Sequence, residues 1–310
     1  MISRPSHTFG ILSLTIALCS LLFIGAVGAG FPLINALIIG TSPLLPLLFF
    51  LSPITLLETL LIIRPSLDRI SETTTFTIPF TDNFSLSVAQ GFGALVVFLG
   101  ILFFIKQRNS FWKMPLSFVF TLLLFWGSFT LLYSENISKT FYELFRLFSI
   151  FFIFALSYSL ITSKQRFIRL LLAVVLSTLI PIITAWMQFF LGIGYTDVAF
   201  SVPRMYGTFA HPNIFALYLI IAVGAVLSLF ILLPSKKHRF LLFFPLGTLF
   251  LTLLFTYARA ALGTFFVFVG LFTLFKYPKA IPFLLITPLL LFFFSPTLQD
   301  RFSDAFNFSP

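Results

Sequence analysis

Long uninterrupted apolar runs constrain this chain more than any other feature. About eleven runs approach the roughly 20 residues that an α-helix needs to cross a bilayer, and short charged or Pro- and Gly-containing breaks separate them. With 59% hydrophobic and 9% charged residues, the chain has too much apolar surface for a water-soluble core. The runs are continuous rather than alternating, which argues against a β-barrel. The sequence therefore predicts an all-α, polytopic transmembrane helix bundle.

We expect about 11 spans, with 9 to 11 as the range, in a single integral membrane domain covering 1–310. Two of the expected spans, 32–50 and 53–69, are interrupted by Pro43, Pro46 and Pro53, so one long tilted helix or a re-entrant pair are alternatives there. The expected spans are 9–29, 32–50, 53–69, 86–105, 114–132, 141–162, 167–191, 213–233, 240–256, 260–275 and 280–296.

The basic residues orient these spans. Twelve of the 19 Lys and Arg residues fall in one set of alternate loops that contains no acid: Arg4, Lys106, Arg108, Lys113, Lys164, Arg166, Arg169, Lys236, Lys237, Arg239, Lys276 and Lys279. The other loops mix six basic residues, among them Arg64 and Arg69, with seven acids. The positive-inside rule places the first set, and the N-terminus, in the cytoplasm. Arg146 and Glu143 stand at i,i+3 helical spacing and are expected to pair.

Composition also excludes several classes of partner and cofactor. The net charge of +10 would favour nucleic acid in a soluble protein, but here the basic residues lie in short clusters between apolar runs, so we expect a lipid bilayer and no nucleic acid. The single cysteine, Cys19, lies within an apolar run and allows neither a disulfide framework nor a cysteine metal site.

A polar island at 195–213, YTDVAFSVPRMYGTFAHPN, interrupts the apolar sequence on the predicted outer face. Gly207 permits a tight turn, and Pro212 suits the first turn of a helix that begins near Asn213. A helix N-terminus favours anions, and the guanidinium fork of Arg204 suits phosphate. A structural alternative is that Arg204 anchors at the lipid headgroups while His211 and Asn213 cap the helix.

A second arginine stands between the next apolar runs on the same predicted side. Arg259, in TYARAALG, has almost no loop around it and no lysine beside it. An orientation signal would belong on the opposite side. We therefore expect Arg204 and Arg259 to form one anion site outside the cytoplasm.

The segment Arg204 to Ala216, R-x-Y-G-T-F-x-H-P-N-x-F-A, followed by Thr256 to Ala261, resembles the O-antigen ligase and O-antigen polymerase superfamily. The segment LIIRPSLD at 61–68 and Gln188, at the end of the span before the island, are also similar to it. The resemblance covers most of the chain, its ligase-related core lying at about 140–310, and the Arg204 segment is its most specific part.

The resemblance implies a glycosyltransferase of the bacterial inner membrane that takes a glycan from an undecaprenyl diphosphate carrier at the outer face. The acceptor would be a lipid-A core sugar, a growing polysaccharide or a protein. By this resemblance Arg204 and Arg259 would be catalytic, binding and neutralising the diphosphate together with Tyr206, Gly207, His211 and Asn213, and no cofactor, nucleotide or obligatory metal is expected.

The family pattern also includes a later extracytoplasmic loop with a histidine base, whereas this sequence stops at Pro310. We therefore expect the chain to lack the C-terminal part of the pattern, which leaves a truncated noncatalytic homologue as one alternative to an enzyme. His211 is the only histidine on the predicted outer face, and its neighbours favour a helix-start role over a base. A lipid-linked glycan flippase is a further alternative, because Glu58 falls within an expected span.

Overall fold

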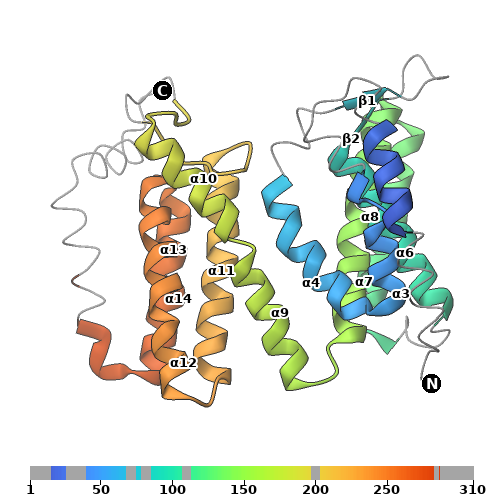
Figure 1. Cartoon of the computed structure of the whole chain (residues 1–310). Helices are drawn as coiled ribbons and strands as arrows, with labels where there is room; N and C mark the ends of the chain where they lie inside the picture. The colour runs from blue at the N-terminus through green and yellow to red at the C-terminus, as the bar shows by residue number, and fades with distance from the viewer. Residues whose placement is uncertain are drawn as a thin grey trace. The chain divides into compact units, whose positions relative to one another are not determined.

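The computed structural model describes residues 15–25, 40–67, 75–77, 85–106, 113–196, 203–282 and 286. The chain forms two compact units (Figure 1). Unit 1 comprises Met1–Leu60 and Ser71–Arg166, and unit 2 comprises Leu61–Ile70 and Phe167–Pro310. The sequence-based interpretation of 1–310 as one membrane domain is not tested by this division into units and stays a prediction.

The helical character expected from the sequence is confirmed. Among the described residues, five helices are long and apolar enough to cross a membrane: Lys139–Leu160, Lys164–Phe190, Pro212–Leu232, Lys236–Phe255 and Arg259–Lys276. These agree closely with the last expected spans before 280. The total of about 11 spans stays a prediction, and Arg4, on which the side of the N-terminus depends, lies outside the described residues.

Unit 1 is built around α8 (Ile137–Leu160), which packs against α6 (Val88–Lys106) and α7 (Ser117–Phe129). The ring of Phe152 on α8 lies so close to Gly100 on α6 that a Cβ at Gly100 would overlap it. Near the start of α8, Glu143 and Arg146 form the expected i,i+3 ion pair, at 2.9 Å and largely exposed.

The proline-interrupted region forms two short helices, α3 (Leu44–Leu51) and α4 (Pro53–Ile63), followed by the 3-10 turn η1 (Arg64–Leu67). Ser52 between the helices is extended, as expected of a residue before proline. At about 1.5 Å per residue, neither helix alone reaches across a hydrocarbon core of roughly 30 Å. The described part of 32–69 thus provides no helix of full span length, because the prolines interrupt the backbone hydrogen bonds.

A short antiparallel hairpin departs from the all-α expectation. Its strands are β1 (Thr75–Thr77) and β2 (Ser85–Ser87), and Phe76 pairs with Leu86. Thr75 and Thr77 of β1 are β-branched, and β-branched residues favour extended backbone.

Unit 2 is organised around α11 (Pro212–Leu232). Its other helices are α9 (Lys164–Leu176, whose first residues belong to unit 1), α10 (Leu179–Phe190), α12 (Lys236–Leu241), α13 (Phe243–Phe255), α14 (Arg259–Lys276) and the 3-10 turn η4 (Pro278–Ala280). Helices α13 and α14 both pack against α11, as Figure 1 shows. Because α11 is apolar on all sides, it occupies the core, where Phe215, Leu219 and Val223 have no exposed surface.

Candidate functional site

The island begins α11 as the sequence predicts. His211 is the N-cap residue and Pro212 occupies the first helical turn. The Asn213 N–H donates to Nδ1 of His211 at 3.1 Å. A neutral imidazole that accepts at Nδ1 carries its proton on Nε2, so in this arrangement His211 has no lone pair left to take a substrate proton. The geometry confirms the helix-start role of His211.

Arg204 is held inside unit 2 rather than at its surface. Its side chain is 4% exposed, and its backbone pairs with Tyr195 through two hydrogen bonds of 2.9 and 3.0 Å. The guanidinium donates from Nε to the Thr256 carbonyl at 2.8 Å and from Nη2 to Oδ1 of Asn213 at 2.7 Å. Arg204 therefore joins the start of α11 to the turn before α14. This burial contradicts the alternative in which Arg204 anchors at lipid headgroups.

Asn213 also differs from its expected capping role. It follows the N-cap by two positions, and its side chain is used by Arg204 rather than by the helix backbone. The residue as a whole is exposed. Its amide thus lies at the boundary between the buried guanidinium and the surface of unit 2.

Gln188, at the end of α10, holds the turn after Arg204. Its Oε1 accepts from the backbone N–H groups of Tyr206 and Gly207 at 3.2 and 2.9 Å, and its Nε2 donates to the Gly207 carbonyl at 2.8 Å. Gln188 is 7% exposed and Tyr206 8% exposed. Buried backbone N–H and C=O groups outside helices and sheets need hydrogen-bond partners. The side-chain amide of Gln188 supplies them for Tyr206 and Gly207, as a neighbouring strand would in a sheet.

Gly207 is required by both conformation and space. Its φ of +57° lies in the left-handed region, and a Cβ there would be 2.7 Å from the Pro181 carbonyl oxygen of α10. Only glycine meets both conditions without strain. The expectation of a tight turn at Gly207 is confirmed.

The segment before α14 forms a second tight turn, at the same end of unit 2. Tyr257 has a positive φ of +51°, and the Thr256 hydroxyl accepts from the Ala258 N–H at 3.3 Å. Ala258 is the N-cap residue of α14, and its side chain makes no capping hydrogen bond. Arg259 is the first residue of the helix. Arg259 is exposed, three positions after the carbonyl that Arg204 binds.

The segment at 61–68, which is distant in the sequence, contacts the polar island through Pro65. Thr208 donates its hydroxyl proton to the Pro65 carbonyl in η1 at 2.6 Å, and η1 also packs on α10. Both residues belong to unit 2. The island is therefore bonded on three sides, by η1, by α10 and by the α13–α14 turn.

The predicted site residues thus divide into two groups. Arg204, Tyr206 and Gly207 are buried and form the foundation, whereas Asn213 and Arg259 are exposed and His211 is half-buried beside the ring of Tyr195. The charge of Arg204 and the N-terminal ends of α11 and α14 favour an anion at this end of unit 2. Within the described ranges, no group of three or more His, Cys, Asp or Glu side chains is placed to hold a metal ion.

Sequence reasoning missed the parts of the site that depend on backbone. The Thr256 carbonyl, the Thr208 hydroxyl and the Tyr195 backbone carry no signature of their own. Gln188 gave one signal, because it is a polar residue at the end of an apolar run. Comparison with known proteins adds no assignment: no family model, no curated protein and no solved structure matches this chain.

Proposed function

We propose that this protein is a membrane glycosyltransferase of the O-antigen ligase or polymerase type. It transfers a glycan from an undecaprenyl diphosphate carrier to a lipid, glycan or protein acceptor at the outer face of the bacterial inner membrane. One observation carries the proposal. Of the four parts of the sequence that resemble the superfamily, three contact the fourth, 204–216: the segment 61–68 through Thr208, Gln188 through Gly207, and 256–261 through Arg204.

The two arginines have different roles in this proposal. Arg259 is exposed at the first turn of α14 and contacts the diphosphate directly. Arg204 contributes its positive charge from a buried position. Its hydrogen bonds to Thr256 and Asn213 hold the turn before α14 against the start of α11. As the bond between sugar C1 and the diphosphate oxygen breaks, negative charge grows on the leaving diphosphate. Cationic donors held in place beforehand stabilise that charge.

The proton of the acceptor hydroxyl needs a base, and His211 is occupied as a helix cap. We therefore assign donor binding, and not acceptor activation, to the residues around Arg204. The positive-inside rule supports an outer location, because Lys276 ends α14 and Lys236 and Lys237 begin α12, at the end of unit 2 opposite Arg204 and Arg259.

The test is binding of undecaprenyl diphosphate to the purified full chain in detergent, with undecaprenyl monophosphate as the comparison ligand. Arg259→Ala is expected to weaken diphosphate binding about tenfold or more, since charge-assisted hydrogen bonds each contribute roughly 1.5–3 kcal/mol. Lys276→Ala, which removes a cation at the other end of α14, is the matched control and should bind normally. Unchanged diphosphate binding by Arg259→Ala would show the proposed site to be wrong.

Glycan transfer is measured separately, with lipid-linked glycan as the donor in reconstituted membranes. Transfer by the wild type and none by Arg259→Ala supports the enzyme. Donor binding without transfer under any acceptor condition points instead to a noncatalytic homologue. Movement of the intact lipid-linked glycan between leaflets, with no transfer, supports the flippase. That reading would place the critical residue at Glu58, which is half-buried within α4.

A further inference from the structure

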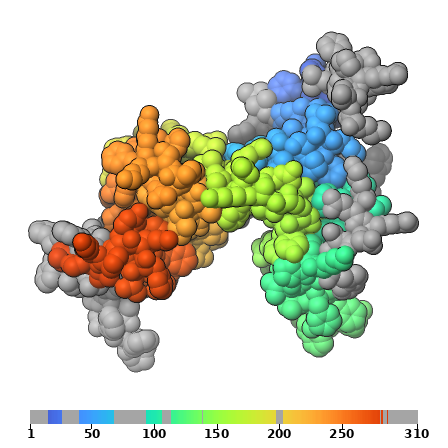
Figure 2. Space-filling view, turned by 90° about the horizontal axis from the view of Figure 1, so that it is seen from below, coloured from blue at the N-terminus to red at the C-terminus, as the bar shows by residue number. Residues whose placement is uncertain are grey.

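A pocket of about 300 Å³ opens at the basic end of unit 2. It lies between the segment that joins α11 to α13 and the end of α14. Figure 2 views the molecule from this end, where the α12–α13 segment, in orange, and the end of α14, in red, share one face. The pocket is lined by Phe230, Lys236, Arg239, Phe240, Phe243 and Tyr277.

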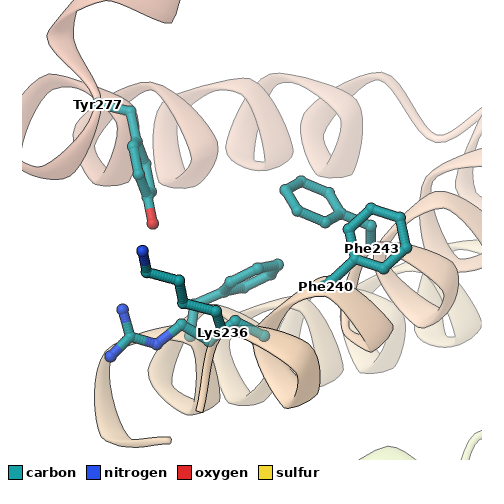
Figure 3. A pocket seen from close by; sticks show the side chains of 6 residues that line it. Lys236, Phe240, Phe243 and Tyr277 are labelled. Carbon is teal, nitrogen blue, oxygen red and sulfur yellow. The ribbon is translucent and has the colours of Figure 1, made fainter. Parts of the chain in front are cut away.

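The polar groups of the pocket converge from two helices. Figure 3 shows the ammonium of Lys236 and the hydroxyl of Tyr277 pointing toward each other across it. Arg239 is fixed at the rim because its Nε donates to the Leu233 carbonyl at 2.7 Å. Within the described part of the chain, neither the Lys236 ammonium nor the Tyr277 hydroxyl makes a hydrogen bond to the protein, and no acid lines the pocket. Two cations and a hydroxyl facing one small space are complementary to a phosphate.

The remaining walls are aromatic and open outward. Phe240 is 74% exposed and Phe243 60% exposed, while Phe230 forms the buried floor. Exposed rings at the end of a transmembrane helix suit the boundary between lipid headgroups and acyl chains. A soluble phosphate ligand has no apolar part to pack against these rings, whereas a phospholipid carries a phosphate and acyl chains in one molecule.

We propose that this pocket binds the phosphate of an anionic phospholipid from the leaflet at the basic end of unit 2. Lys236 and Arg239 contact the phosphate, the Tyr277 hydroxyl donates to one of its oxygens, and the acyl chains lie against Phe240 and Phe243. Basic pockets at the cytoplasmic ends of transmembrane helices are suited to such headgroups. The site lies at the opposite end of α11 and α14 from Arg204 and does not depend on the glycan-transfer proposal.

The experiment titrates the purified full chain with phosphatidylglycerol or phosphatidylcholine of identical acyl chains and counts bound lipids by native mass spectrometry. Lys236→Gln is compared with Lys237→Gln, since these adjacent exposed residues undergo the same change of charge and only Lys236 lines the pocket. We expect the wild type to prefer phosphatidylglycerol. Lys236→Gln should weaken its binding about fivefold, the effect of removing one basic residue near an anionic surface, and Lys237→Gln less than twofold.

Equal effects of the two substitutions, or no preference over phosphatidylcholine, would overturn the proposal, because either shows that general surface charge governs binding. A second arm uses glycerol phosphate, which has the headgroup chemistry without acyl chains. Binding of glycerol phosphate as tight as that of phosphatidylglycerol would also contradict a lipid site. Because the Lys236 side chain makes no hydrogen bond within the described residues, Lys236→Gln should unfold at the wild-type temperature. Lys236→Gln therefore tests the pocket alone, whereas a substitution of Arg239 would also remove the hydrogen bond to the Leu233 carbonyl.

Discussion

Arg204 and Lys236, at opposite ends of unit 2, are cations in opposite environments. At the end where α11 begins, Arg204 is 4% exposed and its guanidinium binds the backbone of one segment and the side chain of another. At the other end, Lys236 is exposed and bonds to nothing in the described protein, while Arg239 makes one backbone contact. A buried cation with several acceptors organises the chain, whereas an exposed one is available to the lipid or ligand outside it. The difference predicts where substitutions will change stability and where they will change only binding.

The largest effect on stability is expected from Arg204→Ala. It leaves the Thr256 carbonyl and the Asn213 amide oxygen without their charged donor, and two such hydrogen bonds together contribute about 3–6 kcal/mol. Thermal unfolding in detergent measures the loss. Arg204→Lys keeps the charge but should recover only one of the two bonds, giving an intermediate value. If Arg204→Ala unfolds at the wild-type temperature, the organising role of this end is wrong.

Gln188→Leu follows, with an expected loss of about 2–4 kcal/mol, because three backbone groups of Tyr206 and Gly207 lose their partner while the volume is nearly kept. The same unfolding assay applies. Gln188→Glu keeps the acceptor but replaces the donor to the Gly207 carbonyl, so it should also destabilise. If Gln188→Leu is as stable as the wild type, the turn at Tyr206 and Gly207 does not depend on the Gln188 hydrogen bonds.

Gly207→Ala should destabilise by about 1–3 kcal/mol, since alanine is strained at a φ of +57° and its Cβ would meet the Pro181 carbonyl oxygen at 2.7 Å. Gly263→Ala is the control within α14, where a Cβ meets nothing within 4 Å. The control should change stability by about 1 kcal/mol or less. Equal losses in the two variants would remove the case for a specific turn at Gly207.

The smallest effect is expected at the basic end. Lys237→Gln should change the free energy of unfolding by no more than about 0.5 kcal/mol, as is usual for exposed residues without structural contacts. The measurement is the same thermal unfolding, made beside Arg204→Ala. A large loss in Lys237→Gln would break the contrast between the two ends, because it would show that the basic end also organises the fold.

The sequence by itself determined the helical class, the approximate positions of the five long apolar helices between 139 and 276, and the start of α11, but not the breaks that separate α9 from α10 and α12 from α13. Apolar run length and the His-Pro dipeptide act locally, so they can be read without tertiary contacts. It also indicated that Arg204 and Arg259 belong to the same end of the bundle, through the alternation of basic loops. It did not predict the short hairpin or the brevity of α3 and α4.

Only the tertiary structure decided what Arg204 does. Whether an arginine near a helix end reaches lipid or turns inward depends on which acceptors lie within reach. Here those acceptors are a carbonyl 52 residues later and an amide nine residues later in the chain. The same holds for Gln188, whose partners are backbone atoms that every residue possesses. The sequence marked the polar residues of the site, and the packing of α10, α11 and the α13–α14 turn determined which form its foundation and which face outward.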